Sequence, residues 1–272
     1  MPSLREALQT FSTVVITGGS SGIGKSFIEL GAKLVPEMHF CNLSRTAPVI
    51  KSVKLNLCHI DCDLSRSESV ATAAAEVETF LAQNVPAGRI LLINNSGFGS
   101  YGRFPEPNLP HQLEMLDVNI RGLVDLTGRL LLTLKSRGGV IINVASTAAF
   151  QPMPFMATYS ATKAFVLHWS LALNHELKGT GVSTLAVCPG PTSTQFFRRA
   201  GLGERTTVDA LSMSGEDVVM QSLQALAAGR SLVVTGWKNK ISAIAGGMSP
   251  KRLATWAAAQ VVERYLRRRG AR

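Results

Sequence analysis

Seven short runs rich in β-branched residues alternate along the chain with longer segments of helical period. This alternation predicts βαβ units, in which a helix returns the chain so that the next strand pairs in parallel. The runs are apolar enough to be covered on both faces, as in a parallel sheet. The expected strands are TVVIT (13–17), HFCNLS (39–44), VKLNLCHIDC (53–62), RILLIN (89–94), GVIINVAS (139–146), GVSTLAVCP (181–189) and SLVVTG (231–236).

Four segments between these strands have the apolar spacing of helices. They cover residues 67–83, 111–135, 159–177 and 215–229. Ser67 is a plausible N-cap of the first, because a serine hydroxyl can accept a hydrogen bond from a free amide of the first turn. The sequence therefore predicts an α/β fold with helices flanking a seven-stranded, mostly parallel sheet.

The chain shows no repeat and no interdomain linker, and its 272 residues, 46% apolar, can bury one large core. We expect residues 1–248 to form one domain and residues 249–272 a basic C-terminal helix or tail. No run approaches the roughly 18 apolar residues that span a bilayer. The first residues, MPSLREALQTFS, are charged where a signal peptide is apolar. We therefore expect a cytoplasmic protein.

The net charge of +10 is concentrated at the C-terminus. Residues 251–272 hold seven Lys or Arg and one Glu, a net +6, so the other 250 residues carry only +4. Because no nucleic-acid-binding motif accompanies this charge, we expect no nucleic-acid partner. The four cysteines lack the C-x-x-C spacing of zinc sites, so we expect reduced, buried thiols and no metal. They are Cys41, Cys58, Cys62 and Cys188.

The tail SPKRLATWAAAQVVERYLRRRGAR predicts a helix that opens at Ser249 and Pro250. Its apolar residues at helical spacing are Leu253, Trp256, Ala257, Val261 and Tyr265. Two interpretations stay open. Either this side packs on the parent domain while the arginines complement the helix dipole, or it dips into an anionic membrane surface as a weak peripheral contact. We favour packing on the domain.

The segment TVVITGGSSGIGKS places Gly18, Gly22 and Gly24 between the first strand and the start of a helix. Glycines there permit a tight turn and a close backbone approach, and the N-terminus of the helix offers free N–H groups to a pyrophosphate. The spacing T-G-x-x-x-G-x-G differs from the common dinucleotide-binding pattern G-x-G-x-x-G and is the more specific of the two. The segment therefore predicts a dinucleotide-binding loop.

Further motifs follow in order: NNSG (94–97), Asn119 in DVNIRG, Ser146, YSATK (159–163) and PGPTST (189–194). Together with the glycine loop, over about residues 13–236, they resemble the short-chain dehydrogenase/reductase family in its short single-domain branch. The resemblance implies a Rossmann-type doubly wound fold that binds NADP(H) or NAD(H). One departure is Ser96, where the family usually has alanine, but a small side chain is retained. Asn94 is expected to stabilise the sheet rather than bind a ligand.

The resemblance assigns a set of residues to cofactor binding. They are Gly18, Ser20, Ser21, Gly22, Ile23, Gly24, Ser44, Arg45, Asp63, Leu64, Asn95, Ser96, Gly97, Tyr159, Lys163, Pro189, Gly190, Thr192 and Thr194. Cofactor choice follows from NLSRT, where the second strand ends without a carboxylate. Ser44 cannot repel a 2′-phosphate and Arg45 can bind one, which favours NADP(H). Asp63 matches the family position that hydrogen-bonds the adenine.

Tyr159 and Lys163 stand four residues apart, so on a helix they present a phenol and an ammonium to the same side. The resemblance implies hydride transfer, with Tyr159 as general acid or base. It also implies that Lys163 lowers the pKa of the phenol and binds the nicotinamide ribose. Ser146 would hydrogen-bond the substrate oxygen, and Asn119 would hold a water that links Lys163 to solvent. His168 and His175 on the same helix are assigned no role.

The segments expected to border the substrate are rich in Phe and Met, which favours a hydrophobic ketone or alcohol, such as an acyl, steroid-like or aromatic compound. They are FGSYGRF (98–104), FQPMPFM (150–156) and TQFFRRAGLG (194–203), and residues 190–214 offer a place for a lid. The leading hypothesis is an NADPH-dependent carbonyl reductase. A cofactor-binding regulator or scaffold without turnover and a sugar-nucleotide epimerase or dehydratase are the alternatives. The intact catalytic set argues against the first, and the glycine spacing against the second. The resemblance also implies a homodimer or homotetramer through the helices at 111–135 and 159–177.

Overall fold

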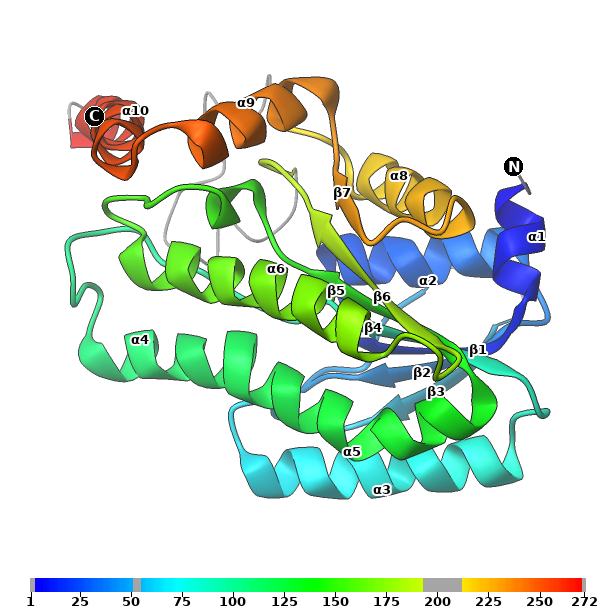
Figure 1. The fold of residues 1–272 in the computed structure, drawn as a ribbon. Helices are drawn as coiled ribbons and strands as arrows, with labels where there is room; N and C mark the ends of the chain where they lie inside the picture. The colour runs from blue at the N-terminus through cyan, green and yellow to red at the C-terminus, as the bar shows by residue number, and fades with distance from the viewer. Residues whose placement is uncertain (1–2, 51–54, 193–211, 271–272) are drawn as a thin grey trace.

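The computed structural model describes residues 3–50, 55–192 and 212–270. Its seven strands form one parallel sheet in the order β3-β2-β1-β4-β5-β6-β7 (Figure 1). The expected seven-stranded Rossmann-type sheet is therefore confirmed. The strands are β1 (Phe11–Thr17), β2 (His39–Leu43), β3 (Asn56–Ile60), β4 (Arg89–Asn94), β5 (Gly139–Val144), β6 (Val182–Cys188) and β7 (Leu232–Val234).

Helices cover both faces of the sheet (Figure 1). They are α1 (Leu4–Gln9), α2 (Gly22–Leu34), α3 (Ser67–Gln83), α4 (Leu109–Leu116), α5 (Gly122–Arg137), α6 (Ala157–Glu176), α8 (Gly215–Ala227), α9 (Trp237–Met248) and α10 (Lys251–Gly270). Strand alternation explains the two layers. In β1, Val14 and Ile16 pack with α1, α2 and α8, whereas Val15 packs with α3 and α5. No helix in the described part of the chain is long and apolar enough to cross a membrane.

The helix expected over residues 111–135 is interrupted by a π-helical turn. Residues Asp117–Arg121 (η1) adopt this wider turn between α4 and α5. A π-turn inserts one extra residue into a helix and recurs at functional sites. Periodicity alone did not predict it, because apolar residues continue on both sides. The turn matters because it carries Asn119, which is one of the expected catalytic residues.

The prediction that Ser67 caps α3 is wrong. Arg66 occupies the N-cap position without a side-chain cap bond, and Ser67 is the first helical residue. The Ser67 hydroxyl instead accepts a hydrogen bond from the Arg121 guanidinium. The Ser67 hydroxyl therefore pairs with Arg121, a residue distant in sequence, and not with a backbone amide at the start of α3.

The C-terminal segment forms two helices, α9 and α10, and the packing face expected for the second is wrong. Among residues 251–263 of α10, Ala254 and Val262 are buried, whereas Trp256 and Val261 are 62% and 69% exposed. These two buried residues are eight positions apart and lie on the side of α10 next to the predicted one. The small side chain of Ala254 lets the helix approach the rest of the protein closely. The division of the chain at residue 248 stays a prediction.

A chain of buried polar side chains joins β4, β5 and α6. The Asn94 amide donates to Asn143 Oδ1 (2.8 Å) and Thr127 Oγ1 (2.9 Å), and the Asn143 amide donates to Ser170 Oγ (2.9 Å). Asn94, Asn143 and Ser170 are at most 2% exposed. Buried polar groups of this kind stabilise a fold only when they are paired. The Asn94 amide nitrogen is paired in this way, whereas Asn94 Oδ1 is buried without a hydrogen-bond partner among the described residues. The expectation that Asn94 stabilises the sheet stays a prediction.

We expect Asn143→Ala to lower the free energy of unfolding by about 2–4 kcal/mol, because two buried hydrogen bonds are lost and polar partners are stranded. Urea denaturation measures the change. The matched control is Asn56→Ala, at an exposed position where the amide donates at 3.3 Å to the Glu37 carbonyl, and there we expect less than about 0.5 kcal/mol. Equal losses at the two positions would contradict a structural role for the buried chain.

Candidate active site

A cavity of about 1400 Å³ lies at the carboxyl ends of the strands, where open parallel sheets bind their ligands. Its wall combines the turns after β1 to β6 with residues of α9 and α10. Most of the expected cofactor residues line it. They are Gly18, Ser20, Ser21, Gly22, Ile23, Ser44, Arg45, Asp63, Leu64, Asn95, Ser96, Gly97, Tyr159, Lys163, Pro189, Gly190 and Thr192.

The glycine loop is shaped by close backbone approaches. Gly18 has φ +70°, and a Cβ there would lie 2.7 Å from Ser96 Oγ. A Cβ on Gly24 would lie 2.3 Å from the Gly18 carbonyl oxygen, so Gly24 packs behind the loop and does not line the cavity. The loop is also tied to β2, because Gly19 N–H donates to Asn42 Oδ1 at 2.7 Å. These contacts hold the N-terminus of α2 open toward the cavity.

The end of β2 presents an uncharged hydroxyl and a cation. Ser44 Oγ accepts a hydrogen bond from the Asn42 amide (2.8 Å) and donates to the Thr46 carbonyl (2.8 Å). Arg45 is largely exposed, and its guanidinium lies 3.5 Å from a carboxylate oxygen of Glu114 on α4. Both members of this ion pair line the cavity. Arg45 is therefore available at the wall of the cavity, with a carboxylate already beside it.

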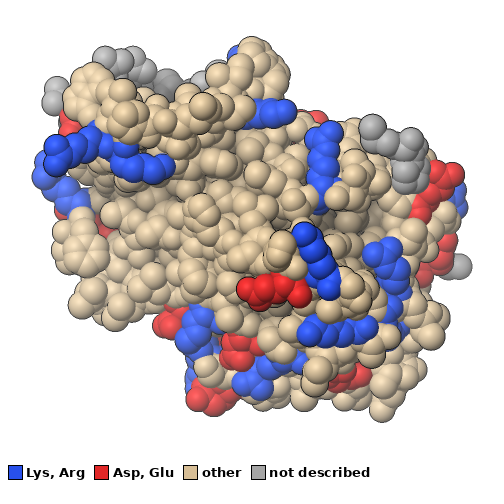
Figure 2. Space-filling view, viewed as in Figure 1, with Lys and Arg blue, Asp and Glu red and all other residues tan. Residues whose placement is uncertain are grey.

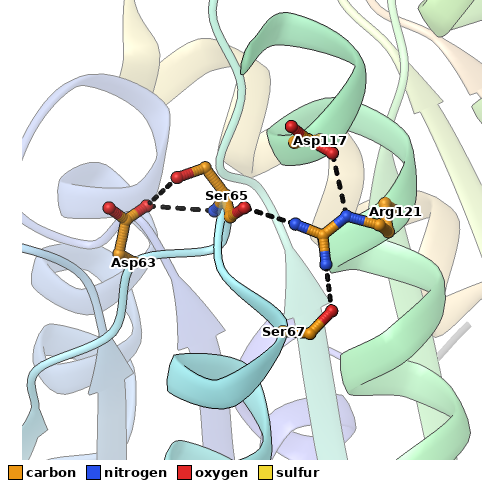
Figure 3. A network of polar contacts seen from close by, with 5 residues as sticks. All are labelled: Asp63, Ser65, Ser67, Asp117 and Arg121. Carbon is orange, nitrogen blue, oxygen red and sulfur yellow. Dashed lines mark hydrogen bonds and ion pairs between the residues drawn. The ribbon is translucent and has the colours of Figure 1, made fainter. Parts of the chain in front are cut away.

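Asp63 belongs to a polar network that fixes the turn after β3 (Figure 3). Its carboxylate accepts hydrogen bonds from Ser65 N–H (3.0 Å) and Ser65 Oγ (2.7 Å). Partial burial opposes ionisation, but these bonds and the cations Arg45 and Arg66 leave its pKa below the ordinary value. Arg121 extends the network: its guanidinium contacts the Ser65 carbonyl, Ser67 Oγ and Asp117.

Tyr159 and Lys163 lie one turn apart on α6, and Ser146 lies opposite them after β5. Lys163 Nζ is 5.9 Å from the centre of the Tyr159 ring and donates to the Val144 carbonyl at 2.9 Å. Ser146 Oγ accepts from Ala148 N–H (3.1 Å) and hydrogen-bonds with Tyr159. All three side chains line the cavity. The structure therefore brings together the predicted acid, its cation and the predicted oxygen-binding hydroxyl.

Asn119 lies behind this group and does not line the cavity. Its side chain accepts from Phe98 N–H (3.1 Å) and donates to the Phe98 carbonyl (2.9 Å) and Thr162 Oγ1 (3.0 Å). A Cβ added at Gly97 would lie 3.0 Å from Asn119 Oδ1 and 3.1 Å from Lys163 Nζ. Asn119 and Lys163 therefore approach the same glycine from within the protein.

The comparison with known proteins agrees with this geometry. The pattern of the short chain dehydrogenase family matches residues 12–228. The chain belongs to the short-chain dehydrogenase family. One relative of this dehydrogenase, a serine 3-dehydrogenase from Rhizobium radiobacter, is 32% identical over 197 residues, which cover 68% of this chain and 73% of the relative.

Solved structures share the fold of this chain. A short chain dehydrogenase from Burkholderia cenocepacia in complex with NADP is 26% identical, with a TM-score of 0.71, over 90% of this chain and 95% of the other. A short chain dehydrogenase/reductase from Burkholderia phymatum in complex with NAD has a TM-score of 0.72 at 23% identity, over 86% and 92% of the two chains. The predicted family and fold are thus confirmed.

Burial controls the ionisation of the two central side chains of the dehydrogenase site. It raises the pKa of Tyr159 to about 12, against the opposing effect of the hydrogen bond with Ser146. It lowers the pKa of Lys163 to about 8, which the nearby Cys188 only partly offsets. Desolvation therefore dominates the pKa of this phenol, and Lys163 Nζ lies 5.9 Å from the centre of its ring. The expectation that Lys163 lowers the pKa of the phenol stays a prediction.

Sequence reasoning missed several residues that shape the dehydrogenase site. Asn42 could have been identified from the sequence, since it is a polar residue inside an apolar strand. Arg121 was not visible, because its partners Ser65 and Ser67 lie more than fifty residues away. The contributions of α9 and α10 to the wall were also missed. Thr194 and residues 194–203 lie outside the described residues, as does most of the possible lid.

The cysteines only partly match the expectation. Cys41, Cys62 and Cys188 are buried, but Cys58 is half-buried, because β3 is an edge strand of the sheet. All four are free thiols. Within the described residues, no cluster of three or more His, Cys, Asp or Glu side chains is arranged to hold a metal ion.

We expect the stability of the parent protein to rise with pH relative to Lys163→Met. Since the pKa of buried Lys163 is lowered from 10.5 to about 8, the unfolded chain holds more protons than the folded one between these values. Unfolding therefore becomes harder as pH rises through this window, by about 2 kcal/mol between pH 8 and 10. Urea denaturation of both proteins at each pH measures the difference, with Lys135→Met on the exposed surface of α5 as control. A pH-independent difference would contradict the lowered pKa.

Proposed function

We propose that the protein is an NADP(H)-dependent oxidoreductase that interconverts a hydrophobic ketone and its alcohol. The observation that carries the proposal is the convergence of Tyr159, Lys163 and Ser146 on one wall of a cavity whose other end is the glycine loop. A proton donor and a pyrophosphate-binding turn are the two parts that this reaction needs in one place. Cytoplasmic location stays a prediction.

The glycine loop fits a dinucleotide. The N–H groups of the first turn of α2 have no helical acceptors, and Gly22 at the start of this helix lines the cavity without a side chain, where a pyrophosphate could approach them. Asp63 and Leu64 would border the adenine, and Lys163 would bind the nicotinamide ribose. Bound NADP(H) would supply or accept the hydride.

The protein's own residues would handle the proton. In reduction, the Tyr159 hydroxyl would give its proton to the carbonyl oxygen, and in oxidation it would take the alcohol proton. Ser146 would hydrogen-bond the same oxygen, where negative charge develops. With its pKa near 8, Lys163 can exchange protons near neutral pH, and Asn119 stands beside it at Gly97 to hold a water toward solvent.

Arg45 and Ser44 support the choice of NADP(H). Likeness alone does not decide between the cofactors, because similar structures hold NADP or NAD. The feature that supports NADP(H) is local: no carboxylate ends β2, and Arg45 lines the cavity. Glu114 at 3.5 Å neutralises Arg45 in part and competes with a 2′-phosphate for it.

The cavity wall supports a hydrophobic substrate. Two of the segments expected to border the substrate contribute to the wall. The apolar lining residues from them are Phe98, Tyr101, Met153 and Met156. The wall continues over α10 with small and aliphatic residues, namely Leu253, Ala254, Ala257, Ala258, Val261 and Val262. The name of the serine 3-dehydrogenase points to a polar substrate for that relative, so the preference for an apolar compound rests on this lining alone.

Exposed apolar residues on three helices support the proposed homodimer or homotetramer. Leu113 and Leu116 lie on α4, Leu132 on α5 and Phe165 on α6, and all four are exposed. Soluble enzymes commonly bury such patches in symmetric contacts. The alternative of a non-catalytic regulator has no specific observation in its favour.

We expect Tyr159→Phe to lower the turnover number at least about 100-fold with NADPH and a hydrophobic ketone, because the proton donor is removed. NADPH affinity should stay within about twofold, since the aromatic ring remains. Absorbance of the nicotinamide measures turnover, and fluorescence titration measures binding. The control is Tyr101→Phe, which removes a phenol elsewhere in the cavity. A Tyr159→Phe enzyme that keeps a tenth of the rate would refute the assignment.

We expect Arg45→Asp to weaken NADPH binding at least about tenfold more than NADH binding, because it places like charge beside the 2′-phosphate. Glu114→Gln should act in the opposite direction and strengthen NADPH binding, because it removes the competing carboxylate. Fluorescence titration of each variant with both cofactors measures the effects. Equal affinities of the parent protein for NADPH and NADH would overturn the cofactor choice.

A further inference from the structure

An apolar stripe runs along the solvent-facing side of α9. Trp237, Ile241, Ile244 and Met248 follow one another at intervals of four, three and four residues, which places them on one face of the helix. All four are exposed, from 51% for Ile244 to 82% for Met248. The helix is held to the protein by the opposite side, where Ala243 is buried. The apolar stripe therefore contributes nothing to the core.

A second stripe continues on α10. Leu253, Trp256 and Val261 are more than half exposed, while the buried Ala254 and Val262 attach the helix. Together, the seven exposed residues of α9 and α10 define a C-terminal apolar surface. Single exposed apolar residues are ordinary, but two adjoining helices that both present large ones mark an interaction site.

Cations predominate on these two helices, whose one carboxylate in the sequence is Glu263. Residues 231–262 contain no Asp or Glu but hold four cations, Lys238, Lys240, Lys251 and Arg252, each exposed. Figure 2 shows mostly tan surface in its upper part, with blue residues and some red at the upper left, where α10 lies, and intermixed red and blue residues in its lower part. An apolar surface with mostly cationic neighbours along its own two helices differs from the rest of the protein in both respects.

We propose that the C-terminal apolar surface docks on an anionic phospholipid bilayer. Exposed tryptophans and aliphatic side chains enter the interface of a membrane, and flanking cations attract anionic headgroups. A second copy of the chain is a poorer occupant, because a symmetric contact through this surface would bring four cations against the same four cations, with Glu263 the one carboxylate on the two helices.

Docking in this way places the cavity at the membrane. Leu253, Ala257 and Val261 of α10 line the cavity and belong to the exposed side of the same helix. An apolar compound dissolved in the bilayer would then reach the cavity along α10 without crossing water. This consequence for the substrate rests on the proposed function, whereas the docking itself does not.

Cosedimentation with vesicles at low salt tests the docking. We expect the full chain to bind vesicles of equimolar phosphatidylcholine and phosphatidylglycerol and to bind phosphatidylcholine vesicles more weakly. Ile244→Ser with Met248→Ser, and separately Lys240→Glu with Lys251→Glu, should each lower partitioning at least about tenfold. None of these four residues lines the cavity, so turnover in detergent-free buffer should be unchanged.

Matched variants separate this surface from general effects. Val49→Ser with Leu109→Ser removes two apolar residues of similar exposure elsewhere, and Lys33→Glu with Lys135→Glu makes the same charge change elsewhere. Both should leave partitioning unchanged.

Three results would overturn the proposal. The first is no vesicle binding by the parent protein, and the second is an equal loss of binding in the matched variants. The third is a changed sedimentation coefficient of Ile244→Ser with Met248→Ser without lipid, which would assign the surface to a subunit contact. An enzyme that turns over ketones without binding vesicles contradicts the docking only, and one that binds vesicles without turnover contradicts the proposed function only.

Discussion

The junction between the glycine loop and the end of β4 is the constraint on which the rest of the site depends. Thr17 Oγ1 accepts hydrogen bonds from the N–H groups of Asn95 and Ser96, both at 3.0 Å. The Asn95 amide returns bonds to the carbonyls of Thr17 (3.0 Å) and Gly18 (3.2 Å). Because β1 and β4 are the strands between which the sheet reverses its order, this junction fixes the crevice itself. Every ligand-facing residue is placed relative to it.

A buried lysine and a buried tyrosine share the centre of that crevice, and both resist ionisation there. Such an arrangement costs folding free energy and persists only where surrounding contacts impose it. Here the contacts are identifiable. The Val144 carbonyl receives the Lys163 ammonium, and the π-turn at Asp117–Arg121 brings Asn119 against Gly97 from the interior. The irregular helix is therefore part of the site, since a regular one would direct Asn119 elsewhere.

Local patterns carried much of the fold and of the site. Apolar runs bounded by turn residues located all seven strands, and the order of motifs located Ser146, Tyr159 and Lys163, because these depend on residues close in sequence. Contacts between distant segments could not be predicted from the sequence. Arg121 reaches back to Ser65 and Ser67, and no periodicity reveals such a reach. The packing face of α10 was misjudged for a related reason: large apolar residues indicate burial only if a partner surface exists for them, and here the small Ala254 meets the domain instead.

The asparagine pair in the middle of the sheet also limits how β4 and β5 can align. Asn94 lies opposite Asn143 in the register of these two parallel strands, surrounded by aliphatic side chains. A shift of either strand by one residue would turn the amides to opposite faces, and a shift by two would place each against a hydrocarbon side chain. Aliphatic residues alone would tolerate such sliding. The hydrogen-bonded pair therefore specifies the register of β4 and β5. Misaligned sheets become less stable than the native one, so the chain folds with the crevice at the ends of these two strands correctly formed.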